Sequence, residues 1–396
     1  MHIHRIILQD LLKELPREFI SILIGPRQAG KSFLLREIEK TCAQKGLKTA
    51  FYNLEDPEHL RLFSKDDAEI ITHLTTGVDI LFLDEFHYLK NATKIFKAIY
   101  DSQKKVKIFA SGSSSLEIHK HLKESLAGRY RLTRIFPLSF QEARQQPNFT
   151  LEHYLTQGGM PGLIHESTLQ EKMALLKNIV ESYILKDIKA LIREENIRAF
   201  NQLMYLIAQN QGSVVSLSSL AREVGLSEPA VAKHFDILAN TYVCYPLESF
   251  SRNLANELKK SKKYYLYDLG IRNSLLRDFS KPARRSDKGA IVETFVFLTL
   301  LRQLKPNMEI KFWRTKQQDE IDFILLKNRI PCPVEVKFIL KDCIVPPAFK
   351  KFFKYYPESP SGIVVSKDFK KELVFEGRRV HFIPLGQVEE LGFLKD

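Results

Sequence analysis

The run of residues with the clearest chemical signature lies near the N-terminus. Positions 25–32 fit the pattern G-x-x-x-x-G-K-[ST] throughout: Gly25, Pro26, Arg27, Gln28, Ala29, Gly30, Lys31 and Ser32. Glycines let backbone amides curl around phosphate oxygens, and the helix that follows adds free N–H groups. Lys31 is expected to reach the β- and γ-phosphates, and the Ser32 hydroxyl to bind Mg²⁺. The pattern predicts a site for a nucleoside triphosphate with its metal.

A pair of acidic residues follows an apolar run further along the chain. Residues 80–83 are Ile-Leu-Phe-Leu, and Asp84 and Glu85 come directly after them. We expect Asp84 to hold Mg²⁺ through its water shell and Glu85 to orient and polarise an attacking water. Small-molecule phosphotransferases need no such glutamate, so the pair favours hydrolysis. The chain has no Asn-Lys-x-Asp motif for reading guanine, which favours ATP over GTP.

Two more polar groups are candidates for contact with the reacting phosphate. An apolar run at residues 106–110 leads into a serine-rich turn, where Ser113 is the preferred candidate and Ser111 the second. An ordinary turn or helix cap is the alternative. Arg129 is a candidate for stabilising transition-state charge, either in cis or in the site of a second copy of the chain, which makes a homo-oligomer an expected partner. A surface or structural role for Arg129 is the alternative.

These groups need a scaffold, and the hydrophobic pattern predicts one. Short apolar runs alternate with helical patterns over the first 140 residues, at 19–24, 49–54, 80–83, 106–110 and 132–136. Continuous apolar strands separated by helices are typical of a parallel sheet that is covered on both faces. A helix expected over residues 32–42 would begin at the glycine-rich loop. The fold class predicted for the chain is α/β.

Together these motifs resemble a bacterial and archaeal family of AAA-type ATPases with a GPRQ phosphate loop. Further matching pieces lie at residues 52–56, 82–85, 111–114, 127–129, 137–140, 158–161, 183–188 and 288–293. Ser32 stands where threonine is more common. The resemblance implies a P-loop AAA-type ATPase core, followed by a winged helix and a restriction-endonuclease-like domain of the PD-(D/E)xK type.

We expect four domains. Residues 1–150 would form the ATPase core and residues 151–206 a helical lid or connector. Residues 207–280 would form the winged-helix-like domain, and residues 281–396 the restriction-endonuclease-like α/β domain. The stretch at 281–287 is the best candidate for a linker.

Residues 215–235 are typical of a helix, a turn at Gly225 and a second helix capped by Ser227. A second helix of this kind lies in the major groove when such a unit reads DNA. The segment is net acidic, which favours a structural or domain-pairing role instead. The run Lys-Lys-Ser-Lys-Lys at 259–263 is a better candidate for phosphate contacts.

Four residues in the last third form an ordered set that resembles the E…D…E-x-K signature of restriction-type nucleases. Glu293 is expected on a helix, Asp322 in a strand, and Glu335 and Lys337 in the next strand. Alternate strand residues share a face, so a hairpin would bring the set together. Its carboxylates would bind Mg²⁺, and Lys337 would stabilise developing charge or help to deprotonate water. A decayed or merely structural site is the alternative.

The charge distribution bears on partners. The chain of 396 residues has a formal net charge of +13, and residues 251–396 contain 29 basic and 18 acidic side chains. Such a surface would attract DNA, and a solvated lysine-rich surface is the alternative. No apolar run approaches the roughly 20 residues that span a bilayer, so no membrane partner is expected. Four scattered cysteines favour a reducing cytoplasm.

The leading functional hypothesis is an ATP hydrolase that acts on DNA, or is regulated by it, through a basic nuclease-like C-terminal domain. The alternative is an ATP-dependent switch whose C-terminal domain is a catalytically inactive protein-interaction module. ATP and Mg²⁺ are the expected cofactors under both hypotheses.

Overall fold

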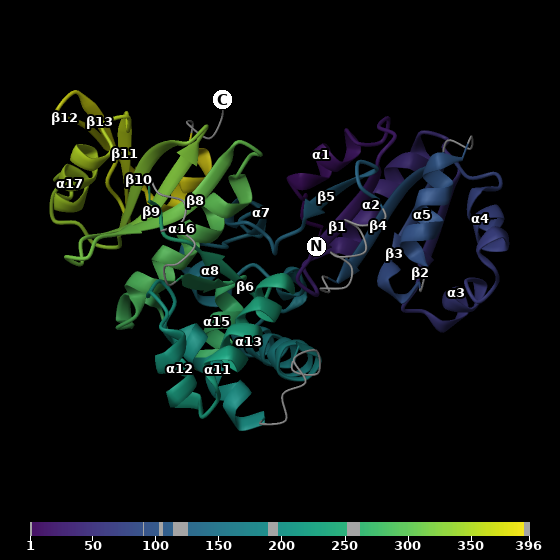
Figure 1. Cartoon of the computed structure of the whole chain (residues 1–396), viewed down its shortest axis with the longest axis horizontal. Coiled ribbons are helices and arrows are strands. Elements are labelled where there is room, and N and C mark those ends of the chain that lie inside the picture. The colour runs from purple at the N-terminus through teal and green to yellow at the C-terminus, as the bar shows by residue number, and fades with distance from the viewer. Residues whose placement is uncertain are drawn as a thin grey trace. The chain divides into compact units, whose positions relative to one another are not determined.

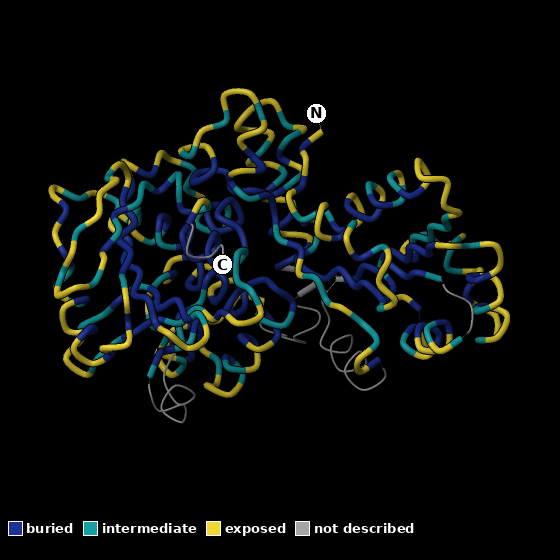
Figure 2. The backbone as a smooth tube through the Cα atoms, turned by 90° about the horizontal axis from the view of Figure 1, so that it is seen from above, coloured by how far each residue is buried: buried dark blue, intermediate teal, exposed yellow. Residues whose placement is uncertain are grey.

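The computed structural model describes residues 2–89, 91–102, 106–113, 126–188, 197–251 and 262–391. The chain forms two compact units. Unit 1 comprises Met1–Gln146, Met160–His165 and Asn240–Val243, and unit 2 comprises Pro147–Gly159, Glu166–Ala239 and Cys244–Asp396. Figure 1 labels their helices and strands, and Figure 2 colours the backbone by how far each residue is buried.

Unit 1 is built on a five-stranded sheet in which every pairing is parallel, with the order β2-β3-β4-β1-β5. The strands are β1 (Ile20–Gly25), β2 (Thr49–Asn53), β3 (Ile80–Asp84), β4 (Lys107–Ser113) and β5 (Tyr130–Arg134). The predicted parallel sheet is therefore confirmed. The continuous apolar runs reflect burial on both faces, since every residue of β1 and β3 is buried.

The α-helices described for unit 1 are α1 (Ile7–Leu12), α2 (Lys31–Gln44), α3 (Pro57–Leu62), α4 (Asp67–Thr75), α5 (Ala92–Asp101) and α7 (Phe140–Ala143). Four of these six described helices lie between the strands in sequence, while α1 precedes β1 and α7 follows β5. Helices α1 and α2 share one apolar core with Leu23, Phe82 and Phe109 from the three central strands. This packing fixes α2 against the sheet, with its first residue at the glycine-rich loop.

Unit 2 begins with helices and one hairpin. Its helical elements are α8 (Leu151–Gln157), α9 (Leu169–Ile179), a π-helix (Val180–Ile188), α11 (Ile197–Gln209), α12 (Leu217–Val224), α13 (Glu228–Asn240) and α15 (Leu269–Leu276). The predicted helix, turn and helix are present: Gly225 ends α12 in the left-handed region, and the Ser227 hydroxyl accepts a hydrogen bond from Ala230 N at 3.3 Å. Strands β6 (Cys244–Leu247) and β7 (Lys263–Leu266) pair antiparallel after them.

The rest of unit 2 is a mixed six-stranded sheet with the order β12-β13-β11-β10-β9-β8. Its elements are β8 (Met308–Arg314), β9 (Glu320–Lys327), β10 (Ile330–Lys337), β11 (Ser361–Ser366), β12 (Lys371–Phe375), β13 (Arg378–Pro384), α16 (Lys288–Gln303) and α17 (Pro347–Tyr355). Successive residues of β9 face opposite sides. Phe323 contacts Phe297 of α16, whereas Ile324 shares a core with Phe352 of α17, so the two helices cover opposite faces.

The edge of this sheet at β8 is joined to the chain that follows β6. Phe312 N donates to Glu248 O at 2.9 Å, and Phe250 N donates to Phe312 O at 2.6 Å. The β6–β7 hairpin is therefore attached to the C-terminal sheet by backbone hydrogen bonds.

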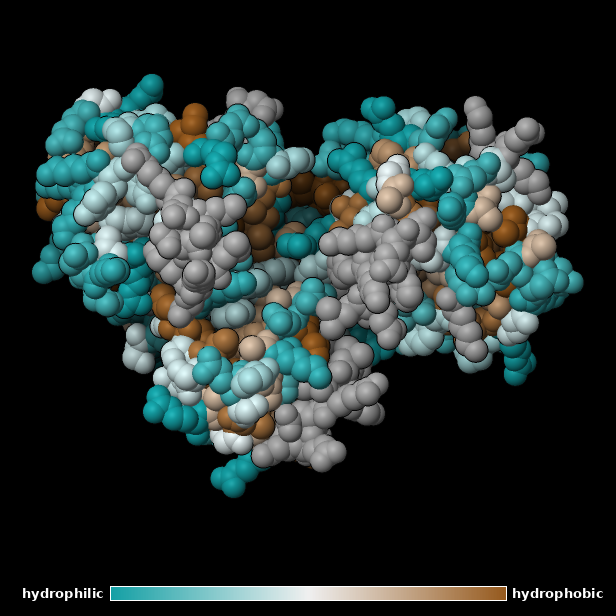
Figure 3. Space-filling view, viewed as in Figure 1, coloured by the Kyte–Doolittle hydropathy of each residue, from teal (hydrophilic) through white to brown (hydrophobic). Residues whose placement is uncertain are grey.

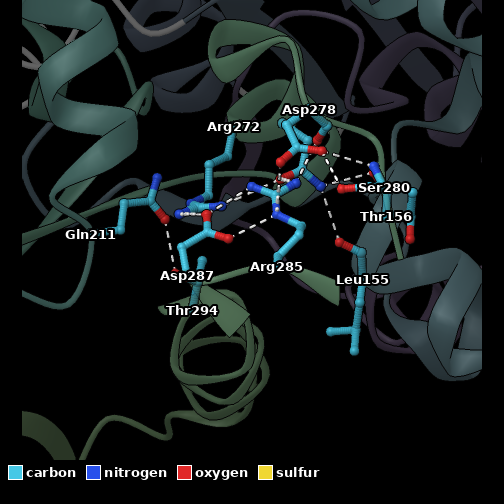
Figure 4. A network of polar contacts seen from close by, with 10 residues as sticks. Leu155, Thr156, Gln211, Arg272, Asp278, Ser280, Arg285, Asp287 and Thr294 are labelled. Carbon is cyan, nitrogen blue, oxygen red and sulfur yellow. Dashed lines mark hydrogen bonds and ion pairs between the residues drawn. The ribbon is translucent and has the colours of Figure 1, made fainter. Parts of the chain in front are cut away.

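The segment predicted as a linker, 281–287, is instead packed into unit 2 (Figure 4). Asp287 accepts hydrogen bonds from Arg272 at 2.8 Å and from Arg285 at 2.7 Å, and both guanidinium groups are buried. Asn273 donates to the carbonyl oxygens of Leu155 and Thr156. Charged residues in a polar stretch are typical of a solvated linker. Here they form ion pairs with one another inside unit 2.

Two further findings concern the chain as a whole. None of the helices that the structure describes is long and apolar enough to cross a membrane. All four cysteines are free thiols with buried side chains.

Candidate functional site

The glycine-rich loop connects the end of β1 to the start of α2, as its motif requires. Gly25 ends the strand with a φ of +153°, and a Cβ there would collide with the carbonyl oxygen of Ile135. Gly30 caps α2 in the left-handed region with a φ of +94°. A Cβ on Gly30 would lie 2.9 Å from Arg5 Nη1. Both glycines are therefore needed for the loop to have this shape.

Lys31 is the first residue of α2, and its side chain folds back over the loop. Its Nζ donates to Gly25 O at 3.2 Å and to Pro26 O at 3.0 Å, and the residue is 4% exposed. Burial lowers the pKa of Lys31, while the nearby carboxylates of Glu85 and Asp84 act to raise it. The structure thus brings the predicted phosphate-binding lysine and the two predicted acids into one site at the carboxyl ends of the strands.

The acidic pair lies at the end of β3, where Asp84 is the last strand residue and Glu85 follows it. Strand β4 lies between β3 and the loop strand β1. Asp84 is buried and accepts a hydrogen bond from the Ser111 hydroxyl on β4. Glu85 N donates to the same hydroxyl at 3.5 Å. Glu85 has a left-handed φ of +53°, and its carboxylate lies 3.2 Å from His87 Nδ1. A non-glycine residue held in this conformation at a strand end is typical of functional sites.

The two serine candidates have different positions. Ser111, the second choice from sequence, is the serine that contacts Asp84, because β3 and β4 pair Leu83 with Ala110 and these two residues come next on their strands. Ser113, the first choice, pairs with Gly25 in the register, at the start of the loop. The side chain of Ser113 lies outside the part of the chain that the structure describes.

Arg5 is a residue of this site that sequence reasoning missed. Its buried guanidinium donates to Ala29 O at 3.0 Å, to Phe136 O at 2.8 Å and to Glu142 Oε1 at 3.1 Å. Glu142 also completes a capping box with Ser139 at the start of α7. The Ser-x-x-Glu spacing was the one available signal for Glu142. Arg5 fixes the carbonyl next to Gly30 and so restrains the loop.

Arg129 lies near the amino ends of the strands, whereas the glycine-rich loop lies at their carboxyl ends. Its carbonyl accepts a hydrogen bond from Ile20 N at the start of β1, whereas the loop follows the end of β1. Its guanidinium contacts the carboxylate of Asp101 at 2.9 and 3.3 Å. This position does not suit Arg129 for action on a nucleotide in its own loop. Action in a second copy stays a prediction.

The second candidate site is in unit 2, where the four predicted residues lie on the predicted kinds of element. Glu293 is on α16, Asp322 on β9, and Glu335 and Lys337 on β10. Asp322 Oδ2 accepts a hydrogen bond from Val336 N at 2.7 Å, and Lys337 Nζ lies 2.7 Å from Glu335 Oε1. Burial, together with the charge of Asp322, raises the pKa of both glutamates.

Lys263 also occupies this cluster. Its fully buried ammonium lies 2.7 Å from Glu320 Oε1 and 3.3 Å from Glu293 Oε1, and the Tyr265 hydroxyl donates to Glu293 Oε1 at 2.7 Å. Within the described ranges, no three His, Cys, Asp or Glu side chains are arranged to hold a metal ion. This arrangement does not suit Mg²⁺, because each of its expected carboxylate ligands is already engaged through one oxygen by a lysine, a tyrosine or a backbone amide. Glu335 Oε2 has no hydrogen-bond partner among the described residues.

The position of Lys263 corrects one prediction. The run 259–263 was expected to contact phosphates from the surface, but Lys263 is buried among carboxylates. Residues 259–261 of that run lie outside the described residues.

Comparison with protein families finds a match for the N-terminal region. Residues 17–144 match the family model of an AAA domain, so this region is similar to AAA domains. Residues 148–282 match a domain of unknown function (DUF8612), and residues 288–388 match another (DUF4143). Arg272 lies within the DUF8612 match, and Asp287 comes directly before the DUF4143 match. The ion pair between these two residues therefore joins the two matched regions.

Relatives that match more than four fifths of this chain occur in bacteria and archaea. A protein of Haemophilus influenzae is 26% identical over 353 residues, which is 84% of this chain and 85% of the relative. A Methanocaldococcus jannaschii protein is 26% identical over 81% of this chain and 75% of its own length. Among solved structures, a Walker-type ATPase of Pyrococcus abyssi has a TM-score of 0.47 at 16% identity, over 68% of this chain and 94% of that chain.

Proposed function

We propose that this chain binds ATP with Mg²⁺ and hydrolyses it. The backbone amides of residues 25–32 and the ammonium of Lys31 would hold the phosphates, and Ser32 and Asp84 would hold Mg²⁺, which neutralises charge on the β- and γ-phosphates. Glu85 would orient the attacking water and accept its proton. Ser111 or Ser113 would lie near the γ-phosphate at the end of β4.

The observation that carries this proposal is the convergence of Lys31, Asp84 and Glu85 at one edge of the parallel sheet. The Lys31 ammonium contacts only two carbonyl oxygens of its own loop among the hydrogen bonds described for it. Phosphate oxygens would replace these neutral acceptors with charged ones and compensate the cost of its burial. The match of residues 17–144 to an AAA domain supports the same function.

A pair of variants tests this proposal. Glu85→Gln should lower ATP turnover by about 100-fold or more, because a general base is removed, while ATP binding persists. Lys31→Ala should weaken ATP binding itself. Lys45→Ala, at the exposed end of α2, is the control and should change neither quantity. Undiminished turnover in Glu85→Gln would show that another group activates water, and unchanged affinity in Lys31→Ala would refute the nucleotide site.

For unit 2 we propose the role of a protein-interaction module that responds to the ATPase domain, and not that of a nuclease. The cation-filled acidic cluster favours this alternative over DNA cleavage. The attachment of residues 248–250 to β8 likewise supports a domain-pairing role for the winged-helix-like segment. We place the protein in the cytoplasm, in line with its four free thiols.

DNA binding is the competing hypothesis, and it rests on the basic composition of residues 251–396. Hydrophilic residues cover most of the visible side around β12, β13 and α17 (Figure 3). The full chain should be tested, since unit 2 also includes residues before 251. Salt-sensitive binding of duplex DNA would favour the DNA hypothesis. Mg²⁺-dependent nicking that disappears in Asp322→Ala and Lys337→Ala would refute the inactive module.

A further inference from the structure

The acidic cluster of unit 2 contains an ammonium group at its centre. Lys263 Nζ contacts Glu320 and Glu293, and the charge of Asp322 also acts on it. We infer that Lys263 is the resident cation of this cluster, that it excludes divalent metal ions from it, and that it fastens the β6–β7 hairpin to the C-terminal sheet. This inference is independent of the proposed ATPase activity.

The backbone on both sides of Lys263 fixes where its side chain enters. Lys263 pairs with Leu247 across the hairpin and forms an isolated bridge with Val214. Tyr265, two residues on, shares its strand face and donates to Glu293 from a ring stacked on Phe297 at 4.1 Å between centroids. Two successive inward residues of β7 thus contact the same glutamate. The position of Lys263 in β7 therefore fixes its ammonium group inside the cluster.

The charges around the ammonium explain why a metal ion is excluded. The Lys263 ammonium forms ion pairs with Glu293 and Glu320, and the Lys337 ammonium forms an ion pair with Glu335. A divalent ion bound between these carboxylates would face a buried ammonium at close range, and like charges repel strongly where water is excluded. Arg314 also pairs with Glu320, so three cations of the chain itself face the four carboxylates and supply most of the compensating charge.

One atom indicates what would happen without Lys263. Glu335 Oε2 is buried and has no hydrogen-bond partner among the described residues. Removing the Lys263 ammonium would leave the negative charges of Glu293 and Asp322 without this cation. Both would lie in the same cluster as the Glu335 oxygen that has no described hydrogen-bond partner. Carboxylate oxygens are the ligands that Mn²⁺ and Mg²⁺ prefer. We therefore expect the lysine-free cluster to take up a divalent ion that the native cluster rejects.

The experiment uses the full chain without nucleotide and compares thermal unfolding with and without Mn²⁺. Lys263→Met should lower the Tm by about 6 °C or more, because breaking a buried pair leaves uncompensated charge. Mn²⁺ should restore part of that loss in Lys263→Met, and adding Asp322→Asn should remove the restoration. The wild type should show no Mn²⁺-dependent rise that depends on Asp322. Lys262→Met, at a neighbouring exposed lysine paired with Glu248, is the control and should resemble the wild type.

Two further results would overturn the inference. One is a Mn²⁺-dependent Tm rise in the wild type that Asp322→Asn abolishes, since the cluster would then bind metal with Lys263 in place. The other is a Lys263→Met Tm equal to that of the wild type. If Lys263→Met does not fold, the double variant with Glu293→Gln decides. It should fold, because the ammonium and the buried charge of Glu293 are removed together, while the partly exposed Glu320 keeps its pair with Arg314. Its failure to fold would contradict the pairing.

Discussion

The hydroxyl of Ser111 donates a hydrogen bond to the carboxylate of Asp84 across two neighbouring parallel strands. Both residues are buried at the sheet edge where the glycine-rich loop begins. The bond leaves Asp84 with a fixed orientation toward the loop. It also connects the predicted Mg²⁺ ligand to the strand that lies between the acid and the loop.

The first prediction concerns the two serines of β4. Ser111→Ala should lower ATP turnover by about tenfold, because a buried hydrogen bond to a charged group is lost and Asp84 is released. Steady-state hydrolysis measures this effect. Ser113→Ala is the matched control on the same strand and should have a smaller effect. The reverse order would restore Ser113 as the serine that contacts the γ-phosphate.

The second prediction concerns Arg5. Arg5→Ala should lower the free energy of unfolding by about 3 kcal/mol, because Glu142 remains buried without its partner. It should also weaken ATP binding, since Ala29 O loses its restraint. Lys13→Ala removes an exposed pair with Asp10 and should cost less than about 1 kcal/mol. Denaturant unfolding with both variants checks the difference, and equal losses would contradict the role of Arg5.

The third prediction concerns Asp287 and pH. Burial acts to raise the pKa of Asp287, but hydrogen bonds from Arg285 and Arg272 bring it down to about 2. A carboxyl whose folded pKa is depressed stabilises the fold above its unfolded pKa of about 3.9 and loses this contribution as the pH falls toward 2. Asp287→Asn should therefore be less stable than the wild type by about 1–2 kcal/mol at pH 7.

The stability difference between Asp287→Asn and the wild type should shrink as the pH falls from about 4 to 2. Urea unfolding across this range measures it. Asp368→Asn, at an exposed position, is the control and should follow the wild-type curve throughout. A difference that stays constant with pH would show that the pairing does not depend on the Asp287 charge.

The fourth prediction concerns Arg129 and a second copy of the chain. Glu85→Gln should be a weak hydrolase, and if Arg129 acts in trans, Arg129→Ala should be one too. Mixing the two variants should then restore part of the activity, because mixed sites combine an intact Glu85 with an intact Arg129. Turnover of the mixture against each variant alone measures this. Absence of recovery would leave Arg129 with its structural pair to Asp101.

The sequence was sufficient to place side chains that are close to one another along the chain. The loop from Gly25 to Ser32 and the acids at the end of β3 are local motifs on strands with strong burial patterns. The Arg5 contacts were not predictable in this way, because Arg5 and Glu142 are 137 positions apart. Lys263 was misjudged for a different reason: a lysine in a basic run is normally solvated, and only the fold reveals the carboxylates around it.

The hydrogen bonds between residues 248–250 and Phe312 have a practical consequence. Strand β8 is an edge strand of the six-stranded sheet. These hydrogen bonds pair part of the row of backbone amides and carbonyls along its outer side. A shortened chain that starts after the β6–β7 hairpin would expose these backbone groups of β8. Exposed edge strands pair with other chains and so promote aggregation. Recombinant fragments of the C-terminal sheet should therefore retain residues from at least Cys244 onward to stay dispersed in solution.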